Sequence, residues 1–235
     1  MKQIPNLFTL LNLVFGCLAI VFILQTGESL VTYEGETYVA ILPEKIWWGS
    51  VCIGIAAIID FLDGFVARLF KASSEMGKQL DSLADIVSFG VAPGLILYQL
   101  LRICYIGTET GLDTPIIALL PAFLFPCAGA WRLARFNIDT SQSTVFKGVP
   151  IPAAGLVVAS LPLILLYNYF DLNNIILNKW VMYGIIVVLS LLMISTLPLI
   201  ALKFKDFTIK NNLPKIILLL VGIASAFFLG WLAVP

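Results

Sequence analysis

The sequence predicts an all-α integral-membrane protein, a polytopic bundle of about seven transmembrane helices. Of its 235 residues, 60% are hydrophobic and only 12% are charged, and the mean hydropathy is +1.00. In a typical soluble domain roughly a quarter of the residues are charged. Seven spans of about 20 residues with short connections account for the length of the chain. This composition excludes a disordered chain, a soluble globular domain and nucleic-acid binding through a basic surface.

Each predicted helix is a continuous apolar run. We expect helices over residues 4–25, 46–71, 80–104, 115–138, 150–170, 180–202 and 214–234. The first run is too long for the apolar part of a signal peptide and no small-residue cleavage site follows it, so we interpret it as a span. The acidic segment 26–44 reads as an outer loop with a short hairpin. The chain then forms a single integral-membrane domain.

The basic residues define the expected orientation. The loops on the N-terminal side contain most of them: Lys2, Arg68, Lys71, Lys78, Arg132, Arg135, Lys147, Lys203, Lys205, Lys210 and Lys215. Lys45, Arg102 and Lys179 lie on the other side. Because basic loops prefer the cytoplasm, we expect a cytoplasmic N-terminus. We place the protein in a prokaryotic plasma (inner) membrane, since the chain carries no targeting feature.

Two absences restrict the chemistry. The chain contains no histidine, which excludes imidazole catalysis and histidine-ligated metals. The four cysteines are far apart within apolar segments and form no C-x-x-C pair, so we interpret them as small apolar core residues.

Four aspartates stand out within the apolar runs. In the second predicted span, the spacing i, i+3, i+4, i+7, i+8 places five residues on one helical stripe: Asp60, Asp63, Gly64, Ala67 and Arg68. In the third, an i, i+4 ridge holds Gly77, Asp81 and Asp85. Because the connection is short, we expect antiparallel neighbours, with the small residues allowing close backbone approach. The four carboxylates would then converge near the cytoplasmic interface.

Carboxylates this close cannot all remain ionised without a cation. An oxygen-only ligand set suits Mg²⁺, Mn²⁺ or Ca²⁺. The two aspartate pairs could hold two ions bridging a phosphate or diphosphate, and Arg68 could grip a phosphate oxygen with its planar fork. The alternative is a structural role as solvated helix-end residues, but intramembrane carboxylates are costly and usually functional.

The string D-x2-D-G-x2-A-R-x8-G-x3-D-x3-D, read here from Asp60 to Asp85, resembles the complete motif of the CDP-alcohol phosphatidyltransferase family. All eight fixed positions match. The resemblance implies a six-helix core over about residues 4–202 plus an additional C-terminal helix at 203–235, a homodimer and a divalent cation, Mg²⁺ or Mn²⁺, as two ions. It also implies metal ligation by Asp60, Asp63, Asp81 and Asp85, with Asp85 as the general base. Residues Gly64, Ala67, Arg68 and Gly77 would line the site for CDP-diacylglycerol.

Other segments resemble the phosphatidylserine synthase branch, namely residues 5–13, 85–93, 132–137 and 147–154, and this resemblance covers about residues 4–155. It implies the reaction of CDP-diacylglycerol with L-serine to give phosphatidylserine and CMP, in phospholipid biosynthesis. The expected serine-binding residues are Arg132, Arg135, Asn137 and Lys147, since guanidinium pairs suit carboxylates or phosphates. The alternative is that the arginines only anchor the cytoplasmic end of their helix, where basic residues are common.

Three polar residues on one side of the first helix, Asn6, Thr9 and Asn12, are expected to bind the cytosine or ribose of CDP-diacylglycerol. Helix capping and helix–helix hydrogen bonding are the alternative.

Two alternatives remain for the function. A glycerol-phosphate or inositol-phosphate acceptor would suit the same cations. A cation or proton transporter would explain buried aspartates, although it would not explain why Gly64, Ala67 and Arg68 share their stripe.

Overall fold

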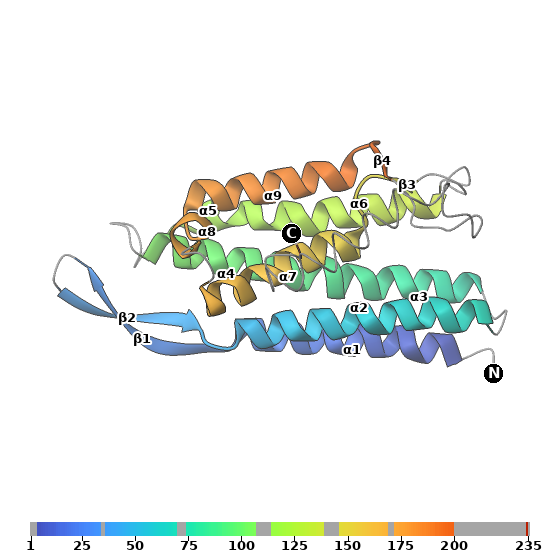
Figure 1. Cartoon of the computed structure of the whole chain (residues 1–235), viewed down its shortest axis with the longest axis horizontal. Helices are drawn as coiled ribbons and strands as arrows, with labels where there is room; N and C mark the ends of the chain where they lie inside the picture. The colour runs from blue at the N-terminus through green and yellow to red at the C-terminus, as the bar shows by residue number, and fades with distance from the viewer. Residues whose placement is uncertain are drawn as a thin grey trace, which may run out of the picture.

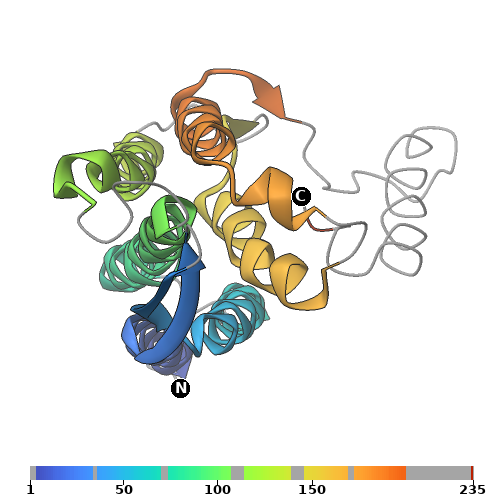
Figure 2. The ribbon, with the colours of Figure 1, turned by 90° about the vertical axis from the view of Figure 1, so that its left-hand side faces the viewer.

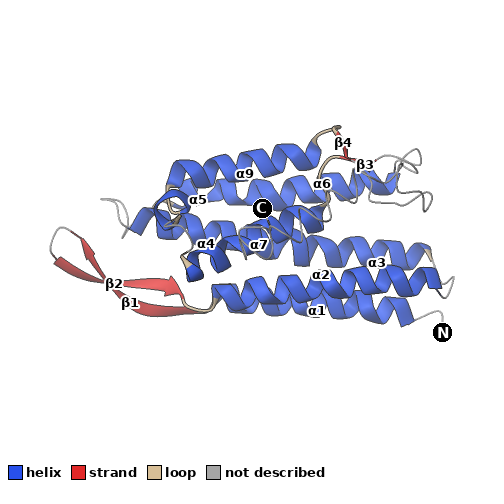
Figure 3. Cartoon of the chain, viewed as in Figure 1, coloured by secondary structure: helices blue, strands red, loops and turns tan. Residues whose placement is uncertain are grey.

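The computed structural model describes residues 4–33, 36–69, 74–106, 114–138, 146–168 and 172–199, together with Val234. Within these ranges the chain forms a bundle of helices that run roughly along one direction (Figure 1). A β-hairpin projects from the end of the bundle opposite the N-terminus, and almost all other regular structure is helical (Figure 3).

The described helices, in chain order, are α1 (Ile4–Leu24), α2 (Ile46–Leu69), α3 (Glu75–Asp85), the π-helix η1 (Ile86–Val91), α4 (Ala92–Ile106), α5 (Ile116–Leu119), the 3-10 helix η2 (Leu120–Phe123), α6 (Leu124–Ile138), α7 (Ile151–Tyr167), α8 (Asn173–Ile176) and α9 (Lys179–Ile194). The strands are β1 (Thr26–Tyr33), β2 (Glu36–Pro43), β3 (Phe146–Lys147) and β4 (Pro198–Leu199).

The helical lengths confirm a membrane-protein bundle. Among the described residues, four helical stretches are long and apolar enough to cross a bilayer: Pro5–Leu24, Ile46–Val66, Glu75–Ile106 and Ile116–Ile138. Helices α7 and α9 are apolar but shorter, with 17 and 16 residues. The helix predicted over 214–234 lies outside the described residues except for Val234.

Two predicted boundaries differ from the structure by five residues or more. The third helix begins at Glu75 instead of residue 80, because the Ser74 side chain caps it by accepting a hydrogen bond from the Gly77 amide at 3.0 Å. The sixth helix ends at Ile194 instead of residue 202. There the backbone turns to an extended conformation at Ser195, and Pro198 lies in a short strand pair with Lys147, where its ring would oppose a continued helix.

The hairpin predicted within 26–44 is present and uses most of that segment. Strands β1 and β2 pair antiparallel over eight residues each, in register from Thr26 opposite Pro43 to Tyr33 opposite Glu36.

The π-helix η1 lies at the centre of the packing, where α1, α6 and α7 all contact it. Glycines permit these close crossings. A Cβ on Gly16 of α1 would lie 2.9 Å from the Ser88 Cα, and one on Gly155 of α7 would lie 2.9 Å from the Phe89 carbonyl oxygen. Small residues at such crossings let helix backbones approach closely. Viewed end-on, α1 and α2 lie below α3 and α4, and α6 and α9 lie above them (Figure 2).

The predicted close approach of the second and third helices at their glycines is not found. A Cβ on Gly64 would meet no atom within 4 Å, whereas one on Gly77 would lie 3.1 Å from Asn6 Oδ1. Helix α3 packs mainly on α1, which also packs along α2. The small residue at position 77 therefore serves the contact with α1. The side chain of Ala67 lies outside the described residues.

The segment before α7 is bound to the end of α9. The Gly148 amide donates to the Leu197 carbonyl oxygen at 3.0 Å, and the Val149 amide donates to the Leu192 carbonyl oxygen at 3.1 Å. Gly148 has a φ of +73°, and a Cβ there would lie 2.6 Å from the Met193 carbonyl oxygen. This position therefore requires glycine, both for its left-handed backbone and for lack of space.

We expect Gly148→Ala to lower the free energy of unfolding by about 1–3 kcal/mol, because the backbone would be strained and the Cβ would displace α9. Gly184→Ala is the matched control. Gly184 lies within α9, where an added Cβ would meet no atom within 4 Å, and alanine favours the helical conformation. Thermal unfolding in detergent measures both. Equal midpoints for the two variants would contradict the packing described at Gly148.

Candidate active site

The predicted site residues gather at one end of the bundle. The N-terminal part of α1, the C-terminal part of α2, the start of α3 and the C-terminal parts of α6 and α9 lie at the same end as the N-terminus (Figure 1). The hairpin, α5 and α8 lie at the other end. All the sequence motifs that indicated chemistry are thereby brought to one side of the fold.

Three of the four aspartates form a compact cluster. One carboxylate oxygen each from Asp60, Asp63 and Asp81 lies within 4.8 Å of the other two. Asp63 is buried and the other two are partly exposed. Asp85 lies one helical turn beyond Asp81, is only 7% exposed, and interacts electrostatically with Asp60 and Asp81. The structure thus brings together carboxylates that come from two separate helices.

Helix α1 orients two of these carboxylates. The Thr9 hydroxyl donates to Asp63 Oδ2 at 2.8 Å, and Asn12 Nδ2 donates to Asp85 Oδ1 at 3.4 Å. Both donors are buried. These contacts are the helix–helix hydrogen bonds that the sequence left open as an alternative, and they direct both side chains toward the carboxylates. A role in binding cytosine or ribose stays a prediction.

Ser88 is part of this arrangement, although the sequence assigned it no role. Its hydroxyl donates to the Asn12 carbonyl oxygen at 3.1 Å, and the residue is fully buried. It lies in the π-helix that starts directly after Asp85. Single π-turns inside helices are rare and occur often at functional sites, but the residue pattern gives no signal for one. Ser88 therefore anchors α1 where Asn12 reaches the carboxylate.

Arg68 and Gly64 lie beside the cluster on α2. Arg68 is exposed, and its Nε donates to the Gly64 carbonyl oxygen at 2.8 Å. The Cα of Gly64 faces open space, since a Cβ there would meet no atom. This leaves open space on α2 next to Asp63, and a role of Gly64 in donor binding stays a prediction.

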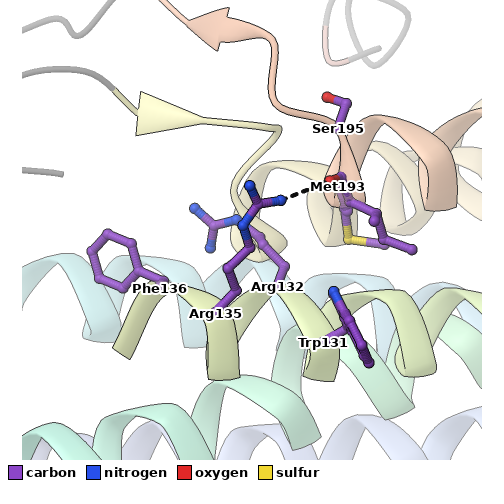
Figure 4. Close-up of a pocket in the computed structure, with 7 residues that line it drawn as sticks. Trp131, Arg132, Arg135, Phe136, Met193 and Ser195 are labelled. Atoms are coloured by element: carbon purple, nitrogen blue, oxygen red, sulfur yellow. Dashed lines mark hydrogen bonds between the residues drawn. The ribbon is translucent and has the colours of Figure 1, made fainter. Parts of the chain in front are cut away.

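A small cleft lies between α6 and the end of α9 (Figure 4). It is lined by Trp131, Arg132, Arg135, Phe136, Met193, Ile194 and Ser195. Both predicted arginines therefore line one cleft, but their surroundings differ. Arg135 is exposed and donates to the Ile194 carbonyl oxygen at 3.4 Å, which caps α9.

Arg132 is partly buried on α6. Its guanidinium carbon lies 5.7 Å from the Phe136 ring centroid, and the group interacts electrostatically with Asp85. Among the described residues the two form no ion pair within 4.0 Å, and the buried Arg132 Nε has no hydrogen-bond partner. Arg132 is therefore available to an anionic ligand beside Asp85.

The two other predicted serine-binding residues are placed differently. Asn137 Nδ2 donates to the Ser82 hydroxyl at 2.9 Å, which joins α6 to α3. The backbone of Lys147 lies in β3, and its side chain lies outside the described residues. Asn6 of α1 lies beside Gly77.

A divalent cation fits the carboxylate cluster. The donor set consists of oxygens only, which hard cations prefer. Two ligand oxygens on opposite sides of Mg²⁺ are about 4.2 Å apart, so three oxygens within 4.8 Å need only a small shift to coordinate one ion. Asp85 and the second oxygens of the cluster leave donors for another ion.

Comparisons with known proteins cover this same region. A family model described as CDP-alcohol phosphatidyltransferase matches residues 2–192. The chain is 34% identical over 227 residues to the CDP-diacylglycerol–serine O-phosphatidyltransferase of Helicobacter pylori strain J99, covering 95% of this chain and 81% of that protein.

A protein of the same name from Bacillus subtilis strain 168 is 32% identical over 184 residues, which cover 76% of this chain and 89% of that protein. The archaetidylserine synthase of Methanothermobacter thermautotrophicus is 31% identical over 159 residues, which cover 67% of this chain and 56% of that protein. The family match runs from α1 into α9 and includes every aspartate of the cluster. The chain therefore belongs to the CDP-alcohol phosphatidyltransferase family.

Proposed function

We propose that this protein transfers the phosphatidyl group of CDP-diacylglycerol to the hydroxyl of L-serine, giving phosphatidylserine and CMP in phospholipid biosynthesis. The observation that carries the proposal is the group of three carboxylate oxygens within 4.8 Å beside the buried Asp85. Such a group suits a cation-bound diphosphate. The names of the relatives from Helicobacter and Bacillus support serine as the acceptor.

The donor would bind at the carboxylate cluster. Asp60, Asp63, Asp81 and Asp85 would hold two Mg²⁺ or Mn²⁺ ions, which when bound would neutralise the diphosphate and the leaving phosphate of CMP. The open surface at Gly64 would admit the diphosphate. The exposed Arg68, next to it, would contact a phosphate oxygen. Asn6, Ala67 and Gly77 complete the proposed donor site.

The acceptor would bind between Asp85 and Arg132. Asp85 accepts the proton of the serine hydroxyl, whose oxygen forms a bond to the phosphorus that bears the diacylglycerol. The bond from that phosphorus to the bridging oxygen breaks, and its electron pair leaves with CMP. Arg132 holds the serine carboxylate. Two unpartnered buried atoms, Asn12 Oδ1 and Arg132 Nε, belong to side chains that contact or face Asp85, as expected for a site that substrate completes.

From the distribution of basic residues we propose how this enzyme is oriented in its membrane. The N-terminus and the active site would face the cytoplasm of a prokaryotic inner membrane, since eleven of the fourteen basic residues belong to that side. Seven spans, a C-terminal helix within 203–235 and a homodimer are parts of the same proposal. The acyl chains of the donor would leave sideways between helices into the bilayer.

Release of CMP from CDP-diacylglycerol in detergent tests the proposed reaction. We expect release that needs both a divalent cation and serine. Glycerol-phosphate and inositol-phosphate are the competing acceptors, because Arg132 and Arg135 could also bind a phosphate. Preferential use of either one would remove serine as the acceptor and leave the family assignment unaffected.

We expect Asp60→Asn, Asp63→Asn and Asp81→Asn each to lower kcat by roughly 100- to 1000-fold, since each removes a charged ligand from the proposed metal site. EDTA should inactivate the wild type, and Mg²⁺ or Mn²⁺ should restore it. Glu75→Gln is the control, because this exposed carboxylate on α3 pairs only with Lys78 in the described structure. A substantial activity in Asp63→Asn would argue against the metal site.

Thr9→Val tests the hydrogen bond that orients Asp63. The substitution keeps the size of the side chain and removes the donor, so we expect the Mg²⁺ concentration for half-maximal activity to rise about tenfold. Thr9→Ser keeps a hydroxyl and should stay near wild type. A cation requirement that is unchanged in Thr9→Val would show that Asp63 needs no donor from α1.

Arg132→Lys should raise the KM for serine about 10- to 100-fold, because a charge-assisted hydrogen bond in a partly buried site contributes about 1.5–3 kcal/mol. The KM for CDP-diacylglycerol should change little. Arg135→Lys should have a smaller effect, because Arg135 is exposed and donates to the end of α9. An unchanged serine KM in both variants would remove this cleft as the acceptor site.

A further inference from the structure

One hydrogen bond directly joins the two helices that carry opposite halves of the proposed site. Asn137 Nδ2 on α6 donates to the Ser82 hydroxyl on α3 at 2.9 Å. The same hydroxyl donates to the Lys78 carbonyl oxygen at 3.1 Å, so Ser82 is held in one orientation by its own helix. The bond links residues 55 positions apart in the sequence.

Ser82 and Asn137 lie close in sequence to the residues that we propose take part in the reaction and bind serine. Ser82 directly follows Asp81 and lies three positions before Asp85. Asn137 lies two positions after Arg135 and five after Arg132. A change in the distance between these two side chains therefore changes the distance between the carboxylates and the guanidinium groups.

Helix α6 also packs against η1, which continues directly from α3, at a second place farther into the bundle. There a Cβ added to Gly129 of α6 would collide with Ile151 of α7 and would lie 3.7 Å from Ile86 Cδ1 of η1, so only glycine allows this close packing. Gly129 and Asn137 are eight residues apart, or about 12 Å along the helix, and Arg132 lies between them. With one end of α6 fixed by apolar packing, the bond at Asn137 sets how closely Arg132 approaches Asp85.

We propose that Ser82 and Asn137 are positioning residues that set the width of the serine site through this hydrogen bond. The inference rests on the proposed function, and it gives Asn137 a role different from the direct contact with serine that the sequence suggested. A neutral hydrogen bond of this kind changes an equilibrium by about two- to tenfold. That is too little to decide folding, but enough to change how often the site is closed around serine.

The test is steady-state kinetics of the full-length enzyme in detergent with CDP-diacylglycerol, for Ser82→Ala, Asn137→Ala and the double variant. We expect each single variant to raise the serine KM about three- to tenfold, with the KM for CDP-diacylglycerol unchanged. The double variant should resemble the single ones, because both remove the same bond. Ser82→Thr keeps the hydroxyl and should restore the wild-type serine KM.

Ser160→Ala is the matched control. The Ser160 hydroxyl of α7 donates to the Val157 carbonyl oxygen within its own helix at 2.7 Å, as Ser82 does to Lys78, but among the described residues no other helix donates a hydrogen bond to it. This variant should keep both KM values. Thermal unfolding midpoints of all variants check that the fold is retained.

Three results would overturn the inference. These are an unchanged serine KM in Ser82→Ala, effects that multiply in the double variant, and an equal rise in the KM for both substrates. A raised serine KM in Asn137→Ala alone would indicate direct contact between Asn137 and serine. If the wild type does not release CMP with serine, the proposed function itself fails, and this result is separate from the other outcomes.

Discussion

The constraint on which the site depends is the convergence of carboxylates in an apolar bundle. Asp60, Asp63 and Asp81 come within 4.8 Å of one another, and Asp85 is buried next to them. Two like charges 4 Å apart repel by about 4 kcal/mol at an effective dielectric constant near 20. The arrangement therefore needs cations or protons, and an oxygen-only donor set of this size suits a divalent metal ion. The Arg132 guanidinium, which interacts electrostatically with Asp85, contributes to this charge balance.

Helix α1 is the element that makes the cluster specific. It packs along α2 and on α3, and it supplies the Thr9 and Asn12 donors to the carboxylates. Its crossing with the π-helix, at Gly16 and Ser88, holds those donors at the correct depth. Orientation of metal ligands by a second layer of hydrogen bonds commonly changes affinity 10- to 100-fold. A helix without any acidic residue thus orients two of the carboxylates on the helices that carry the motif.

Family membership decides between the functions that the residues alone left open. A transporter and an enzyme both account for buried aspartates, but the match to phosphatidyltransferases over residues 2–192 confirms the prediction of an enzyme. The acceptor depends on the other side of the site. Arg132 interacts electrostatically with Asp85, while Arg135 donates to the end of α9, so we propose that Arg132, more than Arg135, binds the acceptor. Gly148 supports that side by allowing the segment before α7 to lie against the end of α9.

The sequence by itself determined the membrane-helical class, the approximate helix positions and the two aspartate stripes, because hydropathy and the 3.6-residue period are local properties. It also predicted that Asp60 and Asp63 would meet Asp81, since a short connection leaves few alternatives. Only the tertiary structure decided that Gly77 packs on α1, that Thr9 reaches Asp63 across 54 positions, and that Asn137 bonds Ser82. Apart from the polar helix α3, most helical faces in this chain are apolar, and lipid is as apolar as a neighbouring helix. Which helices become neighbours is therefore settled by close packing between distant segments, and no local pattern records it.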